Sequence, residues 1–265
     1  MKRPLALFPT IVTLGSCALL LLHGPVFQVP GYSDFADRLT LRGVPHARDV
    51  LSNVGFAIVG AWGWYRLWPE RFDVTLRRGW WGYVLFLAGL TLTALGSAFY
   101  HLAPDNDRLV WDRLPIALVC AGLLAAVRAE SRPGADARRD ALLLTLAAVG
   151  SVAWWRLTDN PPGSGDLRPY LLLQGLPLVL IPIWQWTSAA PRADRAWFGL
   201  ALLLYLAARA AEFHDHELLA ALGWVSGHTL KHLLATLAAA AIVWRLAHRR
   251  RDSELNRDPR GSTRL

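Results

Sequence analysis

Five polar residues lie on strongly apolar segments of this chain, and their types are those of a catalytic metal site: Ser97, His101, Asp112, His228 and His232. Ser97 and His101 share one segment (GSAFYH), and His228 and His232 share another (SGHTLKH), each pair four residues apart. In a helix, this spacing places both side chains of a pair on one face, about one turn apart. Ionisable groups at membrane depth are costly and are usually retained for a pathway, a ligand or chemistry.

Three imidazoles can hold a catalytic zinc ion and leave a fourth position open for water. His101, His228 and His232 are therefore the predicted zinc ligands. Zinc lowers the pKa of a bound water to about 7, which makes hydroxide available without a strong base. We expect Asp112 to accept the proton and pass it to the leaving group, and Ser97 to hydrogen-bond the developing oxyanion or the bound water. The predicted reaction is hydrolysis of an amide or ester whose acyl chain lies in the bilayer.

Each of these residues also has a purely structural interpretation. A histidine in a transmembrane helix often makes an interhelical hydrogen bond, and a serine often packs at a helix interface. Asp112 can pair with Arg113 or Arg108. An isolated His-x3-His pair can also hold haem, so a non-enzymatic metal- or haem-containing membrane sensor stays open as an alternative. The placement of all five residues at one depth favours the hydrolase.

The elements that must position these residues are transmembrane helices. The chain is 54% hydrophobic and contains 13 Trp, and a bilayer core needs ~20 mainly apolar residues per helix. The predicted fold is an all-α, polytopic transmembrane helical bundle with no separate soluble domain. Its eight candidate spans lie near residues 5–26, 50–68, 79–101, 111–128, 140–157, 169–187, 195–211 and 221–247.

The distribution of Lys and Arg orients this bundle. If the spans alternate in direction, one side of the membrane holds 19 Lys and Arg residues and the other holds eight. The positive-inside rule then places both termini in the cytoplasm and all five site residues in the outer half of the membrane. The net charge of +8 is thus explained by topology, and no nucleic-acid partner is expected. The Arg- and Ala-rich, Lys-poor composition indicates a bacterial inner membrane.

The two ends of the chain differ from the segments between them. Residues 1–29 are predicted to form an N-terminal transmembrane helix and the start of an outer loop. Lys2 and Arg3 before an apolar stretch also resemble a signal peptide, but no A-x-A-like cleavage site follows, so we expect the helix to be retained. Residues 248–265 are polar, and we predict a disordered cytoplasmic tail whose Arg cluster lies at the anionic lipid face.

The five residues and their spacing resemble the alkaline ceramidases, within the superfamily of seven-helix membrane hydrolases that also includes adiponectin-receptor-type and Per1-type proteins. The shared pattern here is SAFYH (97–101), WDRLP (111–115) and SGHTLKH (226–232). The 11-residue step from His101 to Asp112 is that of the ceramidase branch. DVLSNVGF (49–56) resembles the Ser-Asn signature on that family's first helix.

This resemblance implies a seven-helix catalytic core over residues 30–247, with the first helix as an addition. It implies zinc bound by the three histidines, catalysis assisted by Ser97 and Asp112, and a membrane lipid as substrate. The implied reaction cleaves the amide of ceramide or a related N-acyl lipid into a free fatty acid and a sphingoid-like base. An ester-linked lipid, as in the Per1 branch, stays open as a second substrate class. Many bacteria make little sphingolipid, which leaves the natural substrate open.

Some animal alkaline ceramidases hold Ca²⁺ in the loop before the Ser-Asn helix. The matching stretch here offers Asp34, Asp37 and Asp49. Carboxylates and carbonyls of this kind can bind Ca²⁺. The same aspartates can instead pair with Arg38 and Arg48, so both interpretations stay open.

Three further polar residues are expected to support the site. Asn53 is predicted to make an interhelical hydrogen bond near the site. Glu212 and Lys231 are predicted to pair, which would satisfy a charge that is expensive in the membrane; direct catalysis by Lys231 is the alternative. The stretch EFHDHE (212–217) has the residues of a metal cluster, but its outer-loop position predicts a solvated polar turn.

Overall fold

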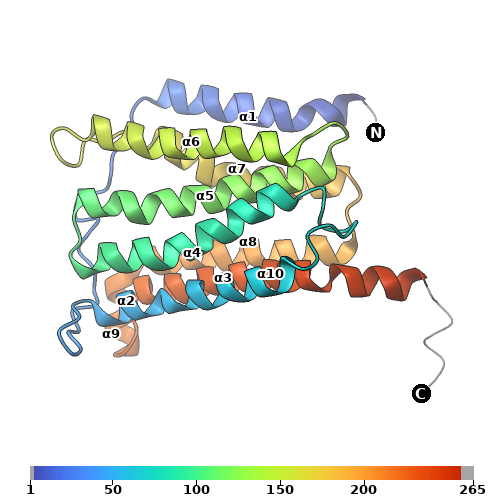
Figure 1. Ribbon diagram of the computed structural model, residues 1–265. Helices are drawn as coiled ribbons and strands as arrows, with labels where there is room; N and C mark the ends of the chain where they lie inside the picture. The colour runs from blue at the N-terminus through green and yellow to red at the C-terminus, as the bar shows by residue number, and fades with distance from the viewer. Residues whose placement is uncertain (1–2, 258–265) are drawn as a thin grey trace, which may run out of the picture.

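Long helices packed side by side make up most of the computed structural model, which describes residues 3–257 (Figure 1). No β-strand occurs in this range, so the predicted all-α bundle is confirmed. Successive long helices run in opposite directions, and both ends of the described chain lie at the same end of the bundle. The helices are α1 (Arg3–His23), α2 (Ala47–Ser52), α3 (Val54–Leu67), α4 (Trp80–Leu102), α5 (Asn106–Ser131), α6 (Ala137–Thr158), α7 (Arg168–Thr187), α8 (Arg192–Phe213), α9 (Asp215–Leu222) and α10 (Gly227–Arg257).

Six of these helices are long and apolar enough to cross a membrane, namely α4, α5, α6, α7, α8 and α10. They indicate a multi-pass membrane protein. The first predicted span corresponds to α1, whose described apolar stretch, Leu7–His23, is shorter. The second corresponds to α2 and α3, which follow each other with only Asn53 between them. Both of these segments lie alongside the other helices in Figure 1.

Glycines bring α4 and α5 into very close contact. Gly82, Gly89 and Gly96 recur every seven residues on the face of α4 that meets α5. A Cβ at Gly96 would collide with the backbone carbonyl of Trp111, and a Cβ at Gly82 would lie 2.6 Å from the carbonyl oxygen of Gly122. Small residues allow such backbone approach between membrane helices. The end of α4 and the start of α5 are therefore held together, and these are the segments that carry Ser97, His101 and Asp112.

A buried ion-pair cluster fixes the opposite end of the bundle. Arg249 of α10 donates to both carboxylate oxygens of Glu130, at 2.6 and 3.1 Å, and lies 3.1 Å from Asp194. Arg245 also donates to Asp194, at 2.5 Å. These contacts join α10 to α5 and α8. Paired, hydrogen-bonded charges can stay buried where isolated ones cannot.

The cluster corrects the prediction for the C-terminal segment. Disorder was expected from residue 248, but α10 continues to Arg257, so this prediction is wrong for residues 248–257. Arg249 is buried in the cluster rather than placed at a lipid surface. Further along, Arg250 pairs with Glu254 one helical turn away, at 2.9 Å, which favours continued helix. The rest of the predicted tail, residues 258–265, lies outside the described residues.

Candidate metal centre

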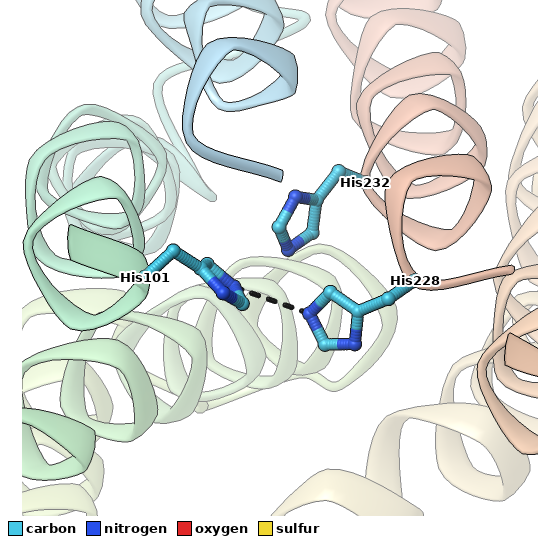
Figure 2. A group of neighbouring side chains, drawn as sticks. All are labelled: His101, His228 and His232. Carbon is cyan, nitrogen blue, oxygen red and sulfur yellow. Dashed lines mark hydrogen bonds between the residues drawn. The ribbon is translucent and has the colours of Figure 1, made fainter. Parts of the chain in front are cut away.

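The three predicted zinc ligands meet at one end of the bundle. His101 comes from the last turn of α4, and His228 and His232 come from the first two turns of α10; all three are buried. Figure 2 shows the three rings facing a common point, with Nε2 of His101 3.1 Å from Nε2 of His228. The candidate ligand nitrogens all lie within 4.8 Å of one another. Tetrahedral zinc with Zn–N bonds of 2.0–2.1 Å separates its nitrogens by about 3.3 Å. The three histidines can therefore hold a metal ion with little movement.

The local sequence starts α10 at the point where the two histidines are needed. Ser226 caps the helix, because its Oγ accepts a hydrogen bond from the backbone N–H of Thr229 at 3.0 Å. Gly227 follows, and a Cβ there would collide with the carbonyl oxygen of Ala211 in α8. Glycine thus lets the first turn of α10 pack directly on α8. The first ligand, His228, comes next in the chain.

Asp215 holds this first turn from α9. Its Oδ1 accepts the backbone N–H of His228 at 2.6 Å, and its Oδ2 accepts the backbone N–H of Ala36 at 2.8 Å. One buried carboxylate thus joins the N-terminal loop to the helix that carries two of the histidines. The prediction of a solvated turn at 212–217 is wrong for Asp215, although His216 and Glu217 are exposed. No local sequence signal distinguishes Asp215 from its exposed neighbours.

His232 is oriented by α2, a contact that the sequence analysis missed. Its Nδ1 lies 2.7 Å from Oγ of Ser52, which donates to the carbonyl oxygen of Asp49 at 2.9 Å. With the Ser52 hydroxyl proton directed at Asp49, Nδ1 of His232 can donate to Ser52, and this tautomer leaves Nε2 free for an ion. Fixing the ring in this way is the usual role of a group behind a metal-bound histidine. The Ser-Asn signature at 52–53 was the available signal.

Asn53 and Asp49 support the same segment. The side chain of Asn53 donates to the carbonyl oxygen of Asp49 at 2.8 Å, within its own stretch of chain, so the predicted interhelical hydrogen bond is wrong. The carboxylate of Asp49 accepts the hydroxyl of Thr229 at 2.5 Å, which ties α2 to α10. This link places Ser52 beside His232.

The three aspartates considered for calcium do not converge. Asp34 pairs with Arg38, and Asp37 pairs with Arg48, at 3.4 Å. Asp37 also accepts the backbone N–H groups at the start of α2, while Asp49 faces α10. Within residues 3–257, the three histidines are the one group of His, Cys, Asp and Glu side chains arranged to hold an ion. The arginine-pairing alternative is therefore the one observed for Asp34 and Asp37, while calcium binding stays a prediction that the structure does not support.

The two predicted catalytic residues lie close together beside the histidines. Asp112, in the second turn of α5, is buried next to Ser97 of α4 and within electrostatic range of Lys231. Arg108 pairs instead with Asp105, at 3.7 Å. No ion pair between Asp112 and an arginine occurs in the described chain, so the structural alternative for this carboxylate is not the one observed.

The predicted Glu212–Lys231 ion pair is present, with 3.0 Å between Nζ and Oε1. Arg209 also pairs with Glu212, so this carboxylate forms ion pairs with two cations. Nζ of Lys231 lies 3.0 Å from Nε2 of His228 as well. The ammonium group therefore sits at the edge of the histidine group rather than at a remote structural position.

A large cavity opens from this site into the bundle. Its volume is about 880 Å³, and its walls come mainly from apolar side chains of α5, α7, α8 and α10. Ser97, Asp112, His228 and His232 line it. Cavities of this size and character hold small molecules that are mostly apolar, with a few polar groups to fix their orientation.

Phe35 covers the histidines from the N-terminal loop. Its ring centroid lies 4.6 Å from that of His101 and 4.4 Å from that of His228. The hydroxyl of Ser33 lies 2.8 Å from that of Tyr100, which fixes the loop to α4. A buried aromatic cover of this kind limits the access of bulk water to the site.

The chain that follows α1 is fixed to the loop between α6 and α7. Asp166 in that loop accepts the backbone N–H of Val26 at 3.3 Å. Burial alone would raise the pKa of Asp166, but hydrogen bonds from Arg168 and Trp154 outweigh this effect and lower the pKa to about 2. Asp166 therefore stays ionised and positions the loop residues that form the outer wall of the cavity.

In comparisons with models of protein families, with curated proteins and with solved structures, the chain gave no match.

Proposed function

We propose that this protein is a membrane-embedded, zinc-dependent hydrolase that cleaves the amide bond of ceramide or a related N-acyl lipid into a free fatty acid and a sphingoid-like base. The observation that carries the proposal is the group of three buried imidazoles, two of which line one apolar cavity together with a carboxylate and a hydroxyl. The ceramide-like substrate is chosen because SAFYH, WDRLP and SGHTLKH resemble the alkaline ceramidase pattern.

Zinc held by the three histidines would act as a Lewis acid and would lower the pKa of a water molecule to about 7. Asp112 would accept a proton from the attacking water and deliver it to the nitrogen of the leaving amine. Ser97 would donate its hydroxyl hydrogen to the carbonyl oxygen as negative charge develops there. Phe35 would limit the entry of bulk water during these steps.

The cavity supports a substrate with a long acyl chain. Its mainly apolar walls run from the histidine end toward Trp186 and Phe198, so a chain can extend along the bundle while its carbonyl group stays beside Asp112. An ester-linked lipid would occupy the same space. The amide is proposed because the spacing from His101 to Asp112 resembles the ceramidase branch.

Two features favour a hydrolase over a metal or haem sensor. Asp112 is buried beside the histidines, and neither a closed structural site nor a bis-histidine haem site requires a carboxylate there. The third imidazole also converges on the point shared by the other two, which leaves no plane for a porphyrin between the rings. A bare ion with one open position suits this geometry best.

The proposed location is a bacterial inner membrane, with the site toward the outer side and both termini in the cytoplasm. Most of the Lys and Arg residues lie at the end of the bundle opposite the site, and this excess supports the orientation. The common position of the two ends of the described chain in Figure 1 is compatible with it.

The first experiment is elemental mass spectrometry of the protein purified in detergent. The wild type should contain about one zinc per chain, and His232→Ala should lose it. His216→Ala is the matched control, because His216 is an exposed histidine near the site. Absence of stoichiometric metal in the wild type, or its retention in His232→Ala, would refute the metal site.

The second experiment tests the reaction. The purified protein is assayed with ceramide, with other N-acyl lipids and with ester analogues of the same chain length. Asp112→Asn should keep its zinc and lose turnover by roughly 100-fold or more, the scale of general acid–base catalysis. Faster cleavage of the esters would transfer the proposal to the ester-cleaving branch. Unchanged turnover in Asp112→Asn would refute the role of this carboxylate.

A further inference from the structure

Arg113 is a buried cation that forms no ion pair among the described residues. It follows Asp112 on α5 and is 3% exposed. Its Nη2 donates to Oε1 of Gln28 at 2.8 Å, while Nε and Nη1 are buried without a hydrogen-bond partner. Among the described residues, no carboxylate forms an ion pair with Arg113. A buried charge in a membrane-spanning segment is costly when no ion pair satisfies it, so its retention points to a functional role.

Aromatic rings surround the Arg113 guanidinium instead of carboxylates. Its central carbon lies 4.0 Å from the ring centroid of Trp155, 5.2 Å from that of Tyr32 and 5.6 Å from that of Tyr170. Ring faces attract a cation, but they do not replace the charged acceptor that a guanidinium prefers. The rings therefore hold the group in place without giving it a directly bonded carboxylate, although the neighbouring Asp112 lies within electrostatic range.

This site is continuous with the proposed active site. Arg113, Gln28, Tyr32 and Tyr170 line the same cavity as Asp112. Adjacent residues on a helix project about 100° apart, so the guanidinium and the carboxylate approach the cavity from neighbouring directions. Tyr170 lies within electrostatic range of both charged groups. A ligand group bound at Arg113 is thus close to the bond that Asp112 would help to cleave.

We infer that Arg113 binds the carboxylate of an acidic lipid, and that the headgroup next to the scissile amide carries this carboxylate. An N-acyl amino acid is the chemical class that fits. Guanidinium groups suit carboxylates because their N–H groups form a planar fork. The assignment of this ligand as substrate rests on the proposed function, whereas binding at Arg113 requires neither metal nor hydrolysis. The released fatty acid carries the same chemical group and is the second source to be distinguished.

The test is equilibrium binding in nanodiscs of zwitterionic lipid, which separates this site from hydrolysis. The probes are N-palmitoylglycine, N-palmitoylethanolamine and palmitate. The first two share the acyl chain and the amide and differ in whether the headgroup carries a carboxylate. Wild type is compared with Arg113→Gln, Arg113→Lys and the matched control Arg195→Gln. Arg195 also lines the cavity and has a buried Nε without a hydrogen-bond partner. It lies about 25 Å along α8 from Glu212, the residue of that helix nearest the histidine group, so it is at the far end of the cavity.

Wild type should bind N-palmitoylglycine at least about tenfold more tightly than N-palmitoylethanolamine. This is the gain in affinity expected from one hydrogen-bonded ion pair. Arg113→Gln should remove this preference, Arg113→Lys should retain part of it, and Arg195→Gln should leave it intact. The affinity for palmitate should be unchanged in Arg113→Gln. Loss of palmitate binding as well would overturn the headgroup assignment in favour of the product carboxylate.

A wild type without carboxylate preference, or a preference that survives in Arg113→Gln, would overturn the inference. Because Arg113 forms no ion pair, its replacement leaves no buried carboxylate without its partner cation, so these variants are expected to fold. The result does not depend on catalysis. If the protein contains no zinc but shows the Arg113-dependent preference, the proposed function fails while the anion site stands.

Discussion

Replacing Asp215 tests how the metal centre is held, because this side chain touches none of the predicted ligand atoms. Its two oxygens accept backbone N–H groups of His228 and Ala36, at 2.6 and 2.8 Å. A hydrogen bond to a charged group contributes about 1.5–3 kcal/mol. Asp215→Ala should therefore lower the free energy of unfolding by about 3–6 kcal/mol, since two such bonds are lost and both donors stay buried. Asp215→Asn keeps one acceptor oxygen and should lose about half as much.

The same change should weaken the metal site. Without Asp215, the backbone at His228 is released and the loop that carries Phe35 loses one of its anchors, the other being the contact of Ser33 with Tyr100. Substitutions behind metal ligands typically weaken affinity about 10- to 100-fold. Affinity is measured by competition with a chelator, and unfolding is followed by denaturant titration in detergent. Glu217→Ala is the matched control, because Glu217 is exposed on the same helix.

The reasoning would be refuted if Asp215→Ala matched Glu217→Ala in both measurements. That result would mean that packing at Gly227 alone positions the first turn of α10. Reduced stability with unchanged metal affinity would refute only the coupling between the carboxylate and the ligands.

Three further substitutions test other contacts. Gly96→Ala should force α4 away from α5 and cost about 1–3 kcal/mol in the free energy of unfolding, whereas Gly175→Ala, which has open space, should not; equal values would contradict the close-contact argument. Glu212→Gln leaves a buried cation unpaired and should lower the free energy of unfolding by about 3–5 kcal/mol. The double variant Glu212→Gln with Lys231→Met should recover part of this loss. If the effects of the two substitutions in unfolding titrations simply add, the two groups do not interact. Asp166, whose pKa falls from its usual 3.8 to about 2, should stabilise the fold fully above about pH 4 and lose this contribution as the pH falls toward 2. The stability difference between wild type and Asp166→Asn should shrink over that pH interval, and a difference independent of pH would contradict the assignment.

Local sequence patterns were sufficient for most of the long helices and for the choice of the three histidines. Apolar length predicts the long spans, and i, i+4 spacing predicts that His228 and His232 share a face. The relation of His101 to this pair followed from alternating topology, because the end of α4 and the start of α10 must lie at the same end of the bundle. The convergence of the three rings agrees with that argument.

Contacts between distant segments were not predictable in this way. Ser52 and His232 are 180 residues apart, and only the packing of α2 on α10 brings them together. Arg249 was assigned to a lipid surface because its neighbours in sequence are polar, whereas its partner Glu130 lies 119 residues away. Asp37 has the side chain of a calcium ligand, but its carboxylate accepts a hydrogen bond from a backbone N–H at the start of α2. Residue type is local information, while the choice of partner depends on tertiary structure.

The histidine group draws its members from two different pairs of helices. α4 packs most extensively against α5, and α10 packs most extensively against α8. His101 belongs to the first pair, His228 and His232 belong to the second, and the cavity has walls from both. An ion bound by all three would therefore be a cross-link between two mechanical units, and its bonds would set the width of the cavity at this end. Metal occupancy and the room available to a lipid would then vary together.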